Sequence, residues 1–398
     1  MKRVLMISDV YFPRINGVST SIETFRRALR EFDVEVRLVV PRYGNEVEED
    51  GVVRVPGRSV PRDPEDRIVA WRAIRDAALR EAEQCDVVHV QTPFLAHYAG
   101  RIAARALGLP LVLTYHTLFE EYLHHYAPFV PRQLLSFLAR KVSRAQCNEV
   151  DAVIVPSTAM RDRLLAYGVR TPLQVLPTGI PLSRFQNGNG DRFRHARGIS
   201  AATPLALFVG RVAHEKNIGF LLDVAREVRA AVPDFLLVIC GEGPALAALR
   251  RRVAHDGSEA FVRFVGNLQR PRALSDCYAA ANVFLFASRT ETQGLVLLEA
   301  MAAGVPVIGL AAMGTIDILA PGRGAIAAAD NVSAFSQTVI GLMRDQIRQR
   351  QLAGEARRFS AEWTDMAMAS RLASLYAGLW CSPRSTSGRP DGPLKTPP

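Results

Sequence analysis

The chain has 398 residues, which is enough for two ordinary globular domains with sizeable cores. Hydrophobic residues make up 48% and charged residues 22%, and no apolar run approaches the ~18 residues that a membrane-spanning helix needs. The net charge of +10 admits nucleic acid, an anionic membrane or a phosphorylated substrate as a partner. Five scattered cysteines and a start without a signal-peptide pattern predict a cytoplasmic chain with reduced thiols and no zinc site.

Short apolar runs alternate with helical patterns through the first half of the chain. The predicted strands are Val4–Ser8, Val34–Val40, Val87–Val90, Leu111–Thr114, Ala152–Pro156 and Leu173–Leu176. Helical stretches such as Thr20–Arg30 and Leu95–Leu107 lie between most of them. This alternation predicts right-handed βαβ units on a parallel sheet, and therefore a Rossmann-like domain over residues 1–178.

A break with turn residues follows, and we interpret residues 179–198, with Pro181 and the run Asn187–Asp191, as a linker. The alternation then restarts in a second domain over residues 199–360. Its predicted strands are Leu205–Val209, Phe235–Cys240, Val262–Val265, Val283–Ala287 and Val305–Leu310. We expect two doubly wound α/β domains that face each other across a cleft, because ligands of such sheets bind beyond the carboxyl ends of the strands.

The end of the chain is predicted as helix followed by tail. Helical patterns lie near Val332–Leu352 and Ala361–Trp380, and the C-terminal helices are expected to pack back on the first domain. Residues 381–398 contain five prolines and are expected to be disordered.

Two glutamates, Glu291 and Glu299, stand on either side of Gly294 between two predicted strands. A helix that starts near Gly294 would present unpaired backbone N–H groups to a ligand, and such a terminus suits a phosphate. Glu291 could accept hydrogen bonds from sugar hydroxyls, and Glu299 could reach a ribose. The alternative is that both are solvated charges at a helix end.

The turn Gly210-Arg211-Val212-Ala213-His214-Glu215-Lys216-Asn217 directly follows a predicted strand. Arginine and lysine at a strand-to-helix turn are the groups that neutralise a pyrophosphate. Lys216 is one of only four lysines in the chain. Gly17 in the first strand-to-helix turn could let the backbone approach a phosphate, and His116 lies at a strand's carboxyl end, where chemistry concentrates in α/β sheets.

In this order the motifs resemble glycosyltransferase family 4, the retaining enzymes of the GT-B fold, over about residues 1–320. Further matches are Pro156-Ser157, Pro177-Thr178-Gly179-Ile180 and the segment Glu299–Ile308. The resemblance implies a catalytic set and a donor-binding set. The catalytic residues would be His116, Glu291, Arg211 and Lys216. The nucleotide-sugar would contact Gly17, Arg211, Lys216, Gly266, Asn267, Leu268, Glu291, Gln293, Gly294, Leu295 and Glu299.

The resemblance also gives these residues roles. Arg211 and Lys216 would neutralise the diphosphate, Glu299 would hold the ribose, and Glu291 would grip the transferred sugar. The chain has no Asp-x-Asp motif, so we expect neither a metal nor a cofactor besides the nucleotide-sugar. Gln293 stands where many members carry Phe or Tyr, and Leu310–Thr315 lacks the usual double glycine.

Two other stretches, Val88–Phe94 and Thr114–Tyr122, resemble the diacylglycerol glucosyltransferase branch of the family, whose members use UDP-glucose. From Pro131 a helical pattern gathers Leu134, Leu135, Phe137, Leu138 and Val142 on one face. The residues expected at the acceptor and the membrane are Tyr11, Asn16, His116, Arg140, Lys141 and Arg144. A basic amphipathic helix suits an anionic leaflet. The alternative is that its apolar face packs on the sheet.

We therefore expect a peripheral enzyme on the cytoplasmic face of the membrane that moves glucose from UDP-glucose to a lipid hydroxyl. One alternative is a mannosyltransferase that uses GDP-mannose on a lipid-linked or soluble glycan. A related possibility is another GT-B enzyme, such as an epimerase. The last is a basic nucleic-acid-binding protein, against which the basic residues are dispersed and form no recognised module.

Overall fold

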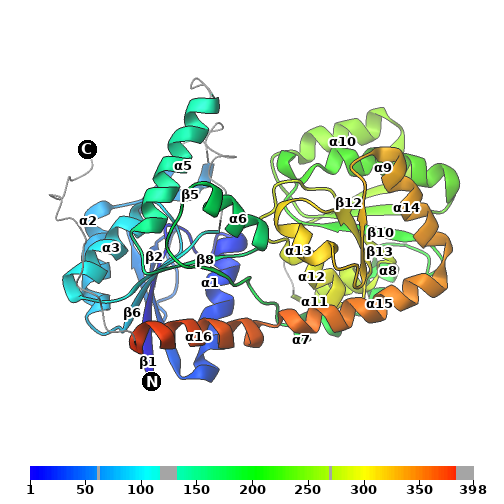
Figure 1. The fold of residues 1–398 in the computed structure, drawn as a ribbon. Helices are drawn as coiled ribbons and strands as arrows, with labels where there is room; N and C mark the ends of the chain where they lie inside the picture. The colour runs from blue at the N-terminus through cyan, green and yellow to red at the C-terminus, as the bar shows by residue number, and fades with distance from the viewer. Residues whose placement is uncertain (61–62, 117–131, 269–270, 382–398) are drawn as a thin grey trace.

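The computed structural model describes residues 1–60, 63–116, 132–268 and 271–381 of the chain. They form two α/β lobes side by side (Figure 1). The first lobe holds a parallel seven-stranded sheet in the order β3-β2-β1-β6-β7-β8-β9, and the second a parallel six-stranded sheet in the order β12-β11-β10-β13-β14-β15. The expectation of two doubly wound parallel sheets is therefore confirmed.

The first lobe contains all the strands that its apolar runs predict. Its sheet comprises β1 (Lys2–Ile7), β2 (Val34–Pro41), β3 (Val52–Val55), β6 (Val87–Val90), β7 (Leu111–Thr114), β8 (Ala152–Val155) and β9 (Leu173–Val175). Its helices include α1 (Gly17–Ala28), α2 (Trp71–Ala82), α3 (Leu95–Leu107), α5 (Arg132–Asn148) and α6 (Thr158–Ala166). Strand β3 and the hairpin of β4 (Gly57–Val60) and β5 (Asp63–Val69) have no counterpart among the predicted elements.

Alternate residues of β1 serve two separate cores, which is why the run is apolar throughout. Val4 and Met6 pack with α1 and α16 (Asp365–Cys381), whereas Leu5 and Ile7 pack with α2 and α3. A parallel strand that is covered on both faces needs apolar side chains on both. Helix α1 begins where Asn16 caps it, since the Asn16 side chain accepts a hydrogen bond from the Ser19 backbone N–H.

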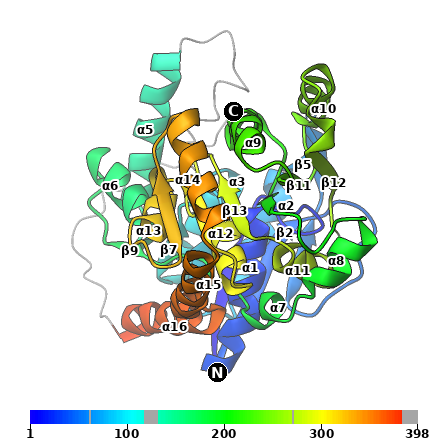
Figure 2. The same ribbon diagram turned by 90° about the vertical axis from the view of Figure 1, so that its right-hand side faces the viewer.

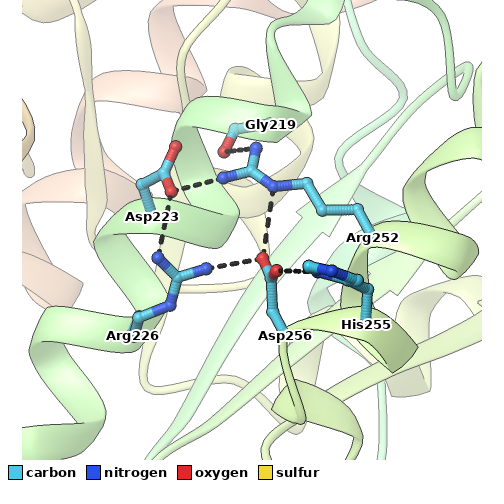
Figure 3. Close-up of polar contacts among 6 residues, drawn as sticks. All are labelled: Gly219, Asp223, Arg226, Arg252, His255 and Asp256. Atoms are coloured by element: carbon cyan, nitrogen blue, oxygen red, sulfur yellow. Dashed lines mark hydrogen bonds and ion pairs between the residues drawn. The ribbon is translucent and has the colours of Figure 1, made fainter.

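The second lobe has one core around its six strands. The strands are β10 (Leu205–Val209), β11 (Leu236–Cys240), β12 (Val262–Gly266), β13 (Val283–Phe286), β14 (Val307–Leu310) and β15 (Ala325–Ala328). Its helices include α9 (Ile218–Ala231), α10 (Leu246–His255), α11 (Pro271–Ala279), α12 (Leu295–Ala302), α13 (Ile316–Leu319), α14 (Val332–Arg344) and α15 (Gln346–Ser360). Outside this core, ion pairs join α9 to α10, between Asp223 and Arg252 and between Arg226 and Asp256. Arg252 also donates to the Gly219 carbonyl (Figure 3). Exposed pairs of this kind add little stability.

The linker prediction for residues 179–198 is wrong. This segment forms α7 (Ser183–Gln186) and α8 (Gly190–Ala196), and Phe185 and Phe193 are buried in the second lobe's core. The glycines that suggested a loop allow close packing instead, because a Cβ at Gly188 would lie 2.1 Å from the Ser275 carbonyl oxygen. The segment therefore belongs to the second lobe.

The chain crosses between the lobes twice, and the two crossings lie side by side. Ile180 pairs with Thr364 in an isolated parallel bridge, and a Cβ at Gly179 would lie 2.4 Å from the Thr364 carbonyl oxygen. After the second crossing α16 runs back under the first lobe (Figures 1 and 2). The expected return to the first lobe is made by α16, whereas α14 and α15 pack on the second. The tail from 382 onward lies outside the described residues.

Candidate functional site

The turn after β10 is clamped against a second glycine-rich turn. The backbone N–H of Val212 donates to the Glu242 carbonyl at 2.8 Å, and the Val212 carbonyl accepts from Ala245 N–H at 3.0 Å. A Cβ at Gly243 would lie 2.5 Å from the Val212 oxygen, so only glycine allows this approach. The segment Gly241-Glu242-Gly243 was not among the predicted site residues, although its spacing after a predicted strand could have indicated it.

The structure brings Lys216 and Glu291 together. The Lys216 ammonium donates to Glu291 Oε1, which joins the strand-to-helix turn to the start of the two-glutamate motif. Two more hydrogen bonds hold these loops side by side, from Ser288 Oγ to the Glu215 carbonyl (3.0 Å) and from Asn217 Nδ2 to the Ala287 carbonyl (3.2 Å). Arg211 is exposed, and its side chain forms no ion pair with any described residue.

Helix α12 starts at the expected place, with Gly294 as its N-cap at φ +89°. The backbone N–H groups of Leu295 and of the residues after it therefore point out of the helix's first turn. Gly314 supports this loop from behind, since its N–H donates to the Glu291 carbonyl at 2.8 Å and a Cβ there would lie 2.0 Å from the Thr292 oxygen. The polar groups predicted for a phosphate and a sugar thus occupy one region of the second lobe.

The Gln293 side chain forms hydrogen bonds across the junction between the lobes. Its Oε1 accepts from the Thr178 N–H at 2.9 Å, and its Nε2 donates to the Thr178 carbonyl at 2.7 Å. Thr178 Oγ1 in turn donates to Ser21 Oγ on α1 at 2.8 Å. All three residues are buried. Only the backbone of Gln293 is left for the predicted contact with a sugar, and its side chain holds the loop to Thr178.

The second glutamate lies beside a buried tyrosine. The Tyr278 hydroxyl on α11 donates to Glu299 Oε2 at 2.7 Å, and burial raises the pKa of the Glu299 carboxyl. The predicted base-binding segment begins at Gly266, at the end of β12 with φ +72°, and its carbonyl accepts from the Gly241 N–H at 2.8 Å. Asn267 and Leu268 follow as loop residues.

In the first lobe, His116 lies at the end of β7 and lines a small pocket with neighbouring loop residues. The pocket is lined by Val18, Gln91, Thr92, Pro93, Leu113, Thr114, Tyr115 and His116. Nε2 of His116 lies 2.9 Å from Gln91 Oε1, and burial lowers the pKa of the imidazole to about 4. The ring is therefore neutral at pH 7. Among the described residues, no hydrogen bond or ion pair joins it to Lys216 or Glu291.

A second histidine, His89, contacts Thr114 of this pocket's lining and is not predicted as a site residue from the sequence. His89 Nδ1 is 2.6 Å from the Tyr376 hydroxyl on α16, and its Nε2 is 2.7 Å from Thr114 Oγ1. Burial lowers the pKa of His89 to about 3. A buried contact with residue 376 is not visible in local sequence, because it depends on how α16 returns.

Two residues predicted at the acceptor, Tyr11 and Asn16, make contacts within the first lobe. Tyr11 is buried, and its hydroxyl donates to Glu23 on α1 at 2.7 Å. Asn16 caps α1. Their side chains are thereby engaged within the first lobe, because the first turn folds back on the helix that it precedes. Gly17 itself is exposed, and a Cβ there would meet no atom within 4 Å.

Helix α5 presents its large apolar residues to solvent. Leu134, Phe137, Leu138 and Val142 are 48–54% exposed, whereas the buried stripe consists of Ala139, Ser143, Gln146 and Cys147. The alternative that the apolar face packs on the sheet is therefore wrong. The helix projects from the first lobe (Figure 1). Two hydrogen bonds anchor its base, between the Tyr115 hydroxyl and Ser143 Oγ (2.8 Å) and from Gln146 Nε2 to the Pro93 carbonyl (2.7 Å).

The basic residues of α5 lie on two sides of this face. The Lys141 ammonium is 4.8 Å from the centre of the Phe137 ring, on the exposed apolar face. Arg140 stacks over the ring of Tyr167 at 5.6 Å, and a Cβ at Gly168 would lie 3.3 Å from Arg144 Nε, so both arginines lie against the end of α6. The neighbouring part of the resemblance, Thr117–Tyr122, lies outside the described residues.

A further contact between the lobes was not predicted. Thr158, at the start of α6, donates its backbone N–H (2.8 Å) and its hydroxyl to the two carboxylate oxygens of Asp317 on α13. Met313 lies nearby with φ +51° and packs on the first lobe's core. It occupies the segment in which the family carries a double glycine, and that departure was the available signal. Within the described residues, no group of three His, Cys, Asp or Glu side chains could hold a metal ion.

Two family models match consecutive parts of the chain, Glycosyltransferase Family 4 over residues 15–184 and Glycosyl transferases group 1 over residues 190–359. The alpha-monoglucosyldiacylglycerol synthase of Streptococcus pneumoniae is 33% identical over 317 residues, which cover 77% of this chain and 70% of that protein. A GDP-mannose-dependent alpha-mannosyltransferase of Mycobacterium tuberculosis is 30% identical over 81% of this chain and 82% of its own length.

Among solved structures, HepE of Anabaena in complex with UDP has a TM-score of 0.74 at 16% identity and covers 95% of this chain and 100% of its own. The two facing α/β lobes and the matched families define a GT-B enzyme. The chain belongs to glycosyltransferase family 4, and it is a glycosyltransferase. The resemblance seen in the sequence is confirmed.

Proposed function

We propose that the enzyme transfers glucose from UDP-glucose to the hydroxyl of diacylglycerol at an anionic membrane surface, with retention of configuration. The observation that carries this proposal is the exposed apolar face of α5, anchored at its base to Tyr115 and Pro93 beside the His116 pocket. An acceptor that stays in a lipid bilayer needs such a surface next to the site. The relatives named as monoglucosyldiacylglycerol synthases favour the same acceptor.

The second lobe supplies the donor site in this proposal. Arg211, Lys216 and the first-turn N–H groups of α12 bind the diphosphate and stabilise the charge that develops as the glycosidic bond breaks. Glu299 accepts hydrogen bonds from the ribose. Glu291, now paired with Lys216, accepts from sugar hydroxyls when the donor is bound. These cationic and dipolar groups would take the place of a metal ion, so we expect activity to survive a chelator.

His116 borders the acceptor. Because burial lowers the pKa of its imidazole to about 4, the ring stays neutral at pH 7 and can only exchange hydrogen bonds with the acceptor hydroxyl or the sugar. The leaving phosphate then receives the acceptor's proton, as front-face attack requires. We place the enzyme on the cytoplasmic leaflet, bound peripherally, and the helices of the described residues include none long and apolar enough to cross the bilayer.

A mannosyltransferase that uses GDP-mannose is the second candidate, because relatives with that name match at 30% identity over most of the chain. HepE, which has the same fold and was solved with UDP and with UDP-glucose, supports a uridine donor instead. The two candidates differ in the donor's base and in its sugar. We do not propose a nucleic-acid partner.

The test uses vesicles of phosphatidylglycerol with diacylglycerol, each donor in turn, and product analysis by mass spectrometry. We expect glucosyldiacylglycerol from UDP-glucose only. Replacing Leu134, Phe137, Leu138 and Val142 with Ser should abolish transfer on vesicles while slow hydrolysis of the donor continues. The control is Ile347→Ser on α15, which removes an exposed apolar side chain elsewhere. Transfer from GDP-mannose, or full activity of the α5 variant, would contradict the proposal.

A further inference from the structure

Glu299 on α12 lies beside Tyr278, a residue that α7 and β13 hold in place. Tyr278, on α11, is fully buried, with its ring centre 5.8 Å from that of Phe185 on α7 and 5.9 Å from that of Phe284 on β13. The Tyr278 ring thus lies nearly perpendicular to the Phe185 ring of α7 and tilted relative to the Phe284 ring of β13. A tyrosine packed in this way has one position for its hydroxyl.

The Tyr278 hydroxyl donates its hydrogen bond to one oxygen of the Glu299 carboxylate. The 2.7 Å hydrogen bond from Tyr278 reaches Oε2, and no described residue hydrogen-bonds Oε1. A carboxylate is planar, so fixing one oxygen also fixes the direction of the other. Glu299 is only partly buried, and an acceptor oxygen that is held in place without a partner among the described residues is suited to a ligand's hydroxyl.

We propose that Tyr278 is a positioning residue of the ribose subsite, which orients the second oxygen of Glu299 toward the ribose hydroxyls of the nucleotide. This inference rests on the proposed role of Glu299 in donor binding. It assigns no contact between Tyr278 and the donor. It explains why a fully buried tyrosine points its hydroxyl at a carboxylate that is itself only partly buried.

The charges around the pair set the expected pH dependence. Burial raises the pKa of Glu299, while the Tyr278 hydrogen bond and the positive charge of Arg184 on α7 act against that rise. Burial and the neighbouring carboxylate raise the pKa of Tyr278 well above its ordinary value, and the thiols of Cys240 and Cys277 add to this. The hydroxyl therefore remains a donor at every working pH, and Glu299 is the group that titrates.

The experiment is calorimetric binding of UDP and 2′-deoxy-UDP to the full chain, with GDP as a further probe, between about pH 5 and pH 8. In Tyr278→Phe we expect UDP affinity to fall about tenfold. Its preference for UDP over the deoxy analogue should shrink. Because the variant lacks the hydrogen bond that favours the carboxylate, the loss of affinity on acidification should begin at a higher pH than in the wild type.

Two variants complete the design. Tyr376→Phe removes another fully buried tyrosine hydroxyl, which bonds to His89 in the first lobe. This variant should leave the UDP affinity, the preference for UDP over the deoxy analogue and the pH dependence of binding unchanged. In the Glu299→Gln background, Tyr278→Phe should have little added effect, because both act through one carboxylate. If Tyr278→Phe fails to fold, Phe185→Leu releases the packed ring while keeping the hydroxyl and should give a smaller change in the same direction.

Unchanged UDP affinity, deoxy preference and pH dependence in Tyr278→Phe would overturn the inference, as would failure of the wild type to bind either nucleotide. The outcome is separable from the proposed function. Normal UDP binding without transfer to diacylglycerol would reject the acceptor and leave the ribose subsite standing. Transfer with no effect of Tyr278→Phe would reject only the role of Tyr278.

Discussion

Helix α5 of the first lobe differs in surface character from the two second-lobe loops that we propose to bind the donor, residues 210–217 and 287–294. These two segments are called the donor loops. The donor loops combine charged side chains with glycines that allow backbones to touch, and Lys216, Glu291 and Ser288 bond them to one another. Helix α5 instead stands away from its lobe and exposes leucine and phenylalanine. The difference fits the two roles that we propose, because a diphosphate is best bound by groups fixed in place beforehand, whereas contact with a lipid surface requires exposed apolar area.

Removing the central charge of the donor loops should have the largest effect. Lys216→Ala takes away a cation that we expect to stabilise the leaving diphosphate, and turnover should fall by ~10²-fold to 10³-fold. Thermal unfolding of the variant checks that the fold is retained. Steady-state kinetics with donor and vesicles provide the measurement, and turnover close to that of the wild type would remove Lys216 from the mechanism.

The next prediction concerns the buried histidine under the first lobe's pocket. The pKa of His89 is about 3 in the folded protein against 6.5 for an exposed imidazole. The unfolded chain thus binds a proton that the folded chain excludes, and stability that is present above pH 6.5 falls as the pH drops toward 3. Between pH 7 and about pH 4.5 this amounts to about 3 kcal/mol. Measured by urea unfolding, the free energy of unfolding should depend less on pH in His89→Gln than in the wild type. An identical pH dependence in the two proteins would refute a neutral buried His89.

A third variant breaks the connection between the two regions. Gln293→Leu leaves the buried N–H and carbonyl of Thr178 unpaired, which should cost about 2 kcal/mol. The matched control is Gln349→Leu, because Gln349 Nε2 donates to the Leu342 and Met343 carbonyls within the second lobe alone. Differential scanning calorimetry should show the lobes unfolding less cooperatively in the first variant only. Equal behaviour of both would mean that Gln293 does not couple the lobes.

The smallest effect is expected on α5. Lys141→Ser removes a cation from the exposed apolar face and should weaken binding to anionic vesicles by about 1 kcal/mol. Co-sedimentation with phosphatidylglycerol vesicles measures this, and Arg350→Ser on α15 is the control. We expect neutral vesicles to bind Lys141→Ser and the wild type equally well. A loss of the same size on neutral vesicles would show that Lys141 acts through packing and not through its charge.

The sequence predicts the strands well, because buried parallel strands are continuous apolar runs. It misses the hairpin of β4 and β5. It also misses β3 and β15, which are short edge strands, one half-exposed and one rich in alanine. It also mistakes residues 179–198 for a linker, since Gly188 and Gly190 indicate turns locally while their real role is to admit the backbone of α11. Local patterns cannot reveal which partner a glycine faces.

The site follows the same division. Lys216, Glu291 and Gly294 are predicted as site residues from their positions after strands. The structure pairs Lys216 with Glu291 and places Gly294 at the start of α12, three residues on, while their roles stay predictions. The contact of Tyr11 with Glu23 is not predicted because it forms only when the first turn folds onto α1. The contacts of Tyr278 and Asp317 are not predicted because their partners are distant in the sequence. The apolar residues of α5 were recognised, but whether they faced the sheet or solvent required the packed lobe.

The return of α16 has a consequence for biosynthesis. Met368, Leu372 and Tyr376 are part of the first lobe's own core, on the face that α1 covers. A ribosome completes the strands of that lobe by residue 175 but delivers these side chains only after the whole second lobe. At ~5–20 residues per second, a nascent first lobe spends ten seconds or more with an apolar face uncovered. During that interval the unfinished enzyme exposes apolar surface of the kind that chaperones bind, and a chain that stops before α16 would keep that surface exposed.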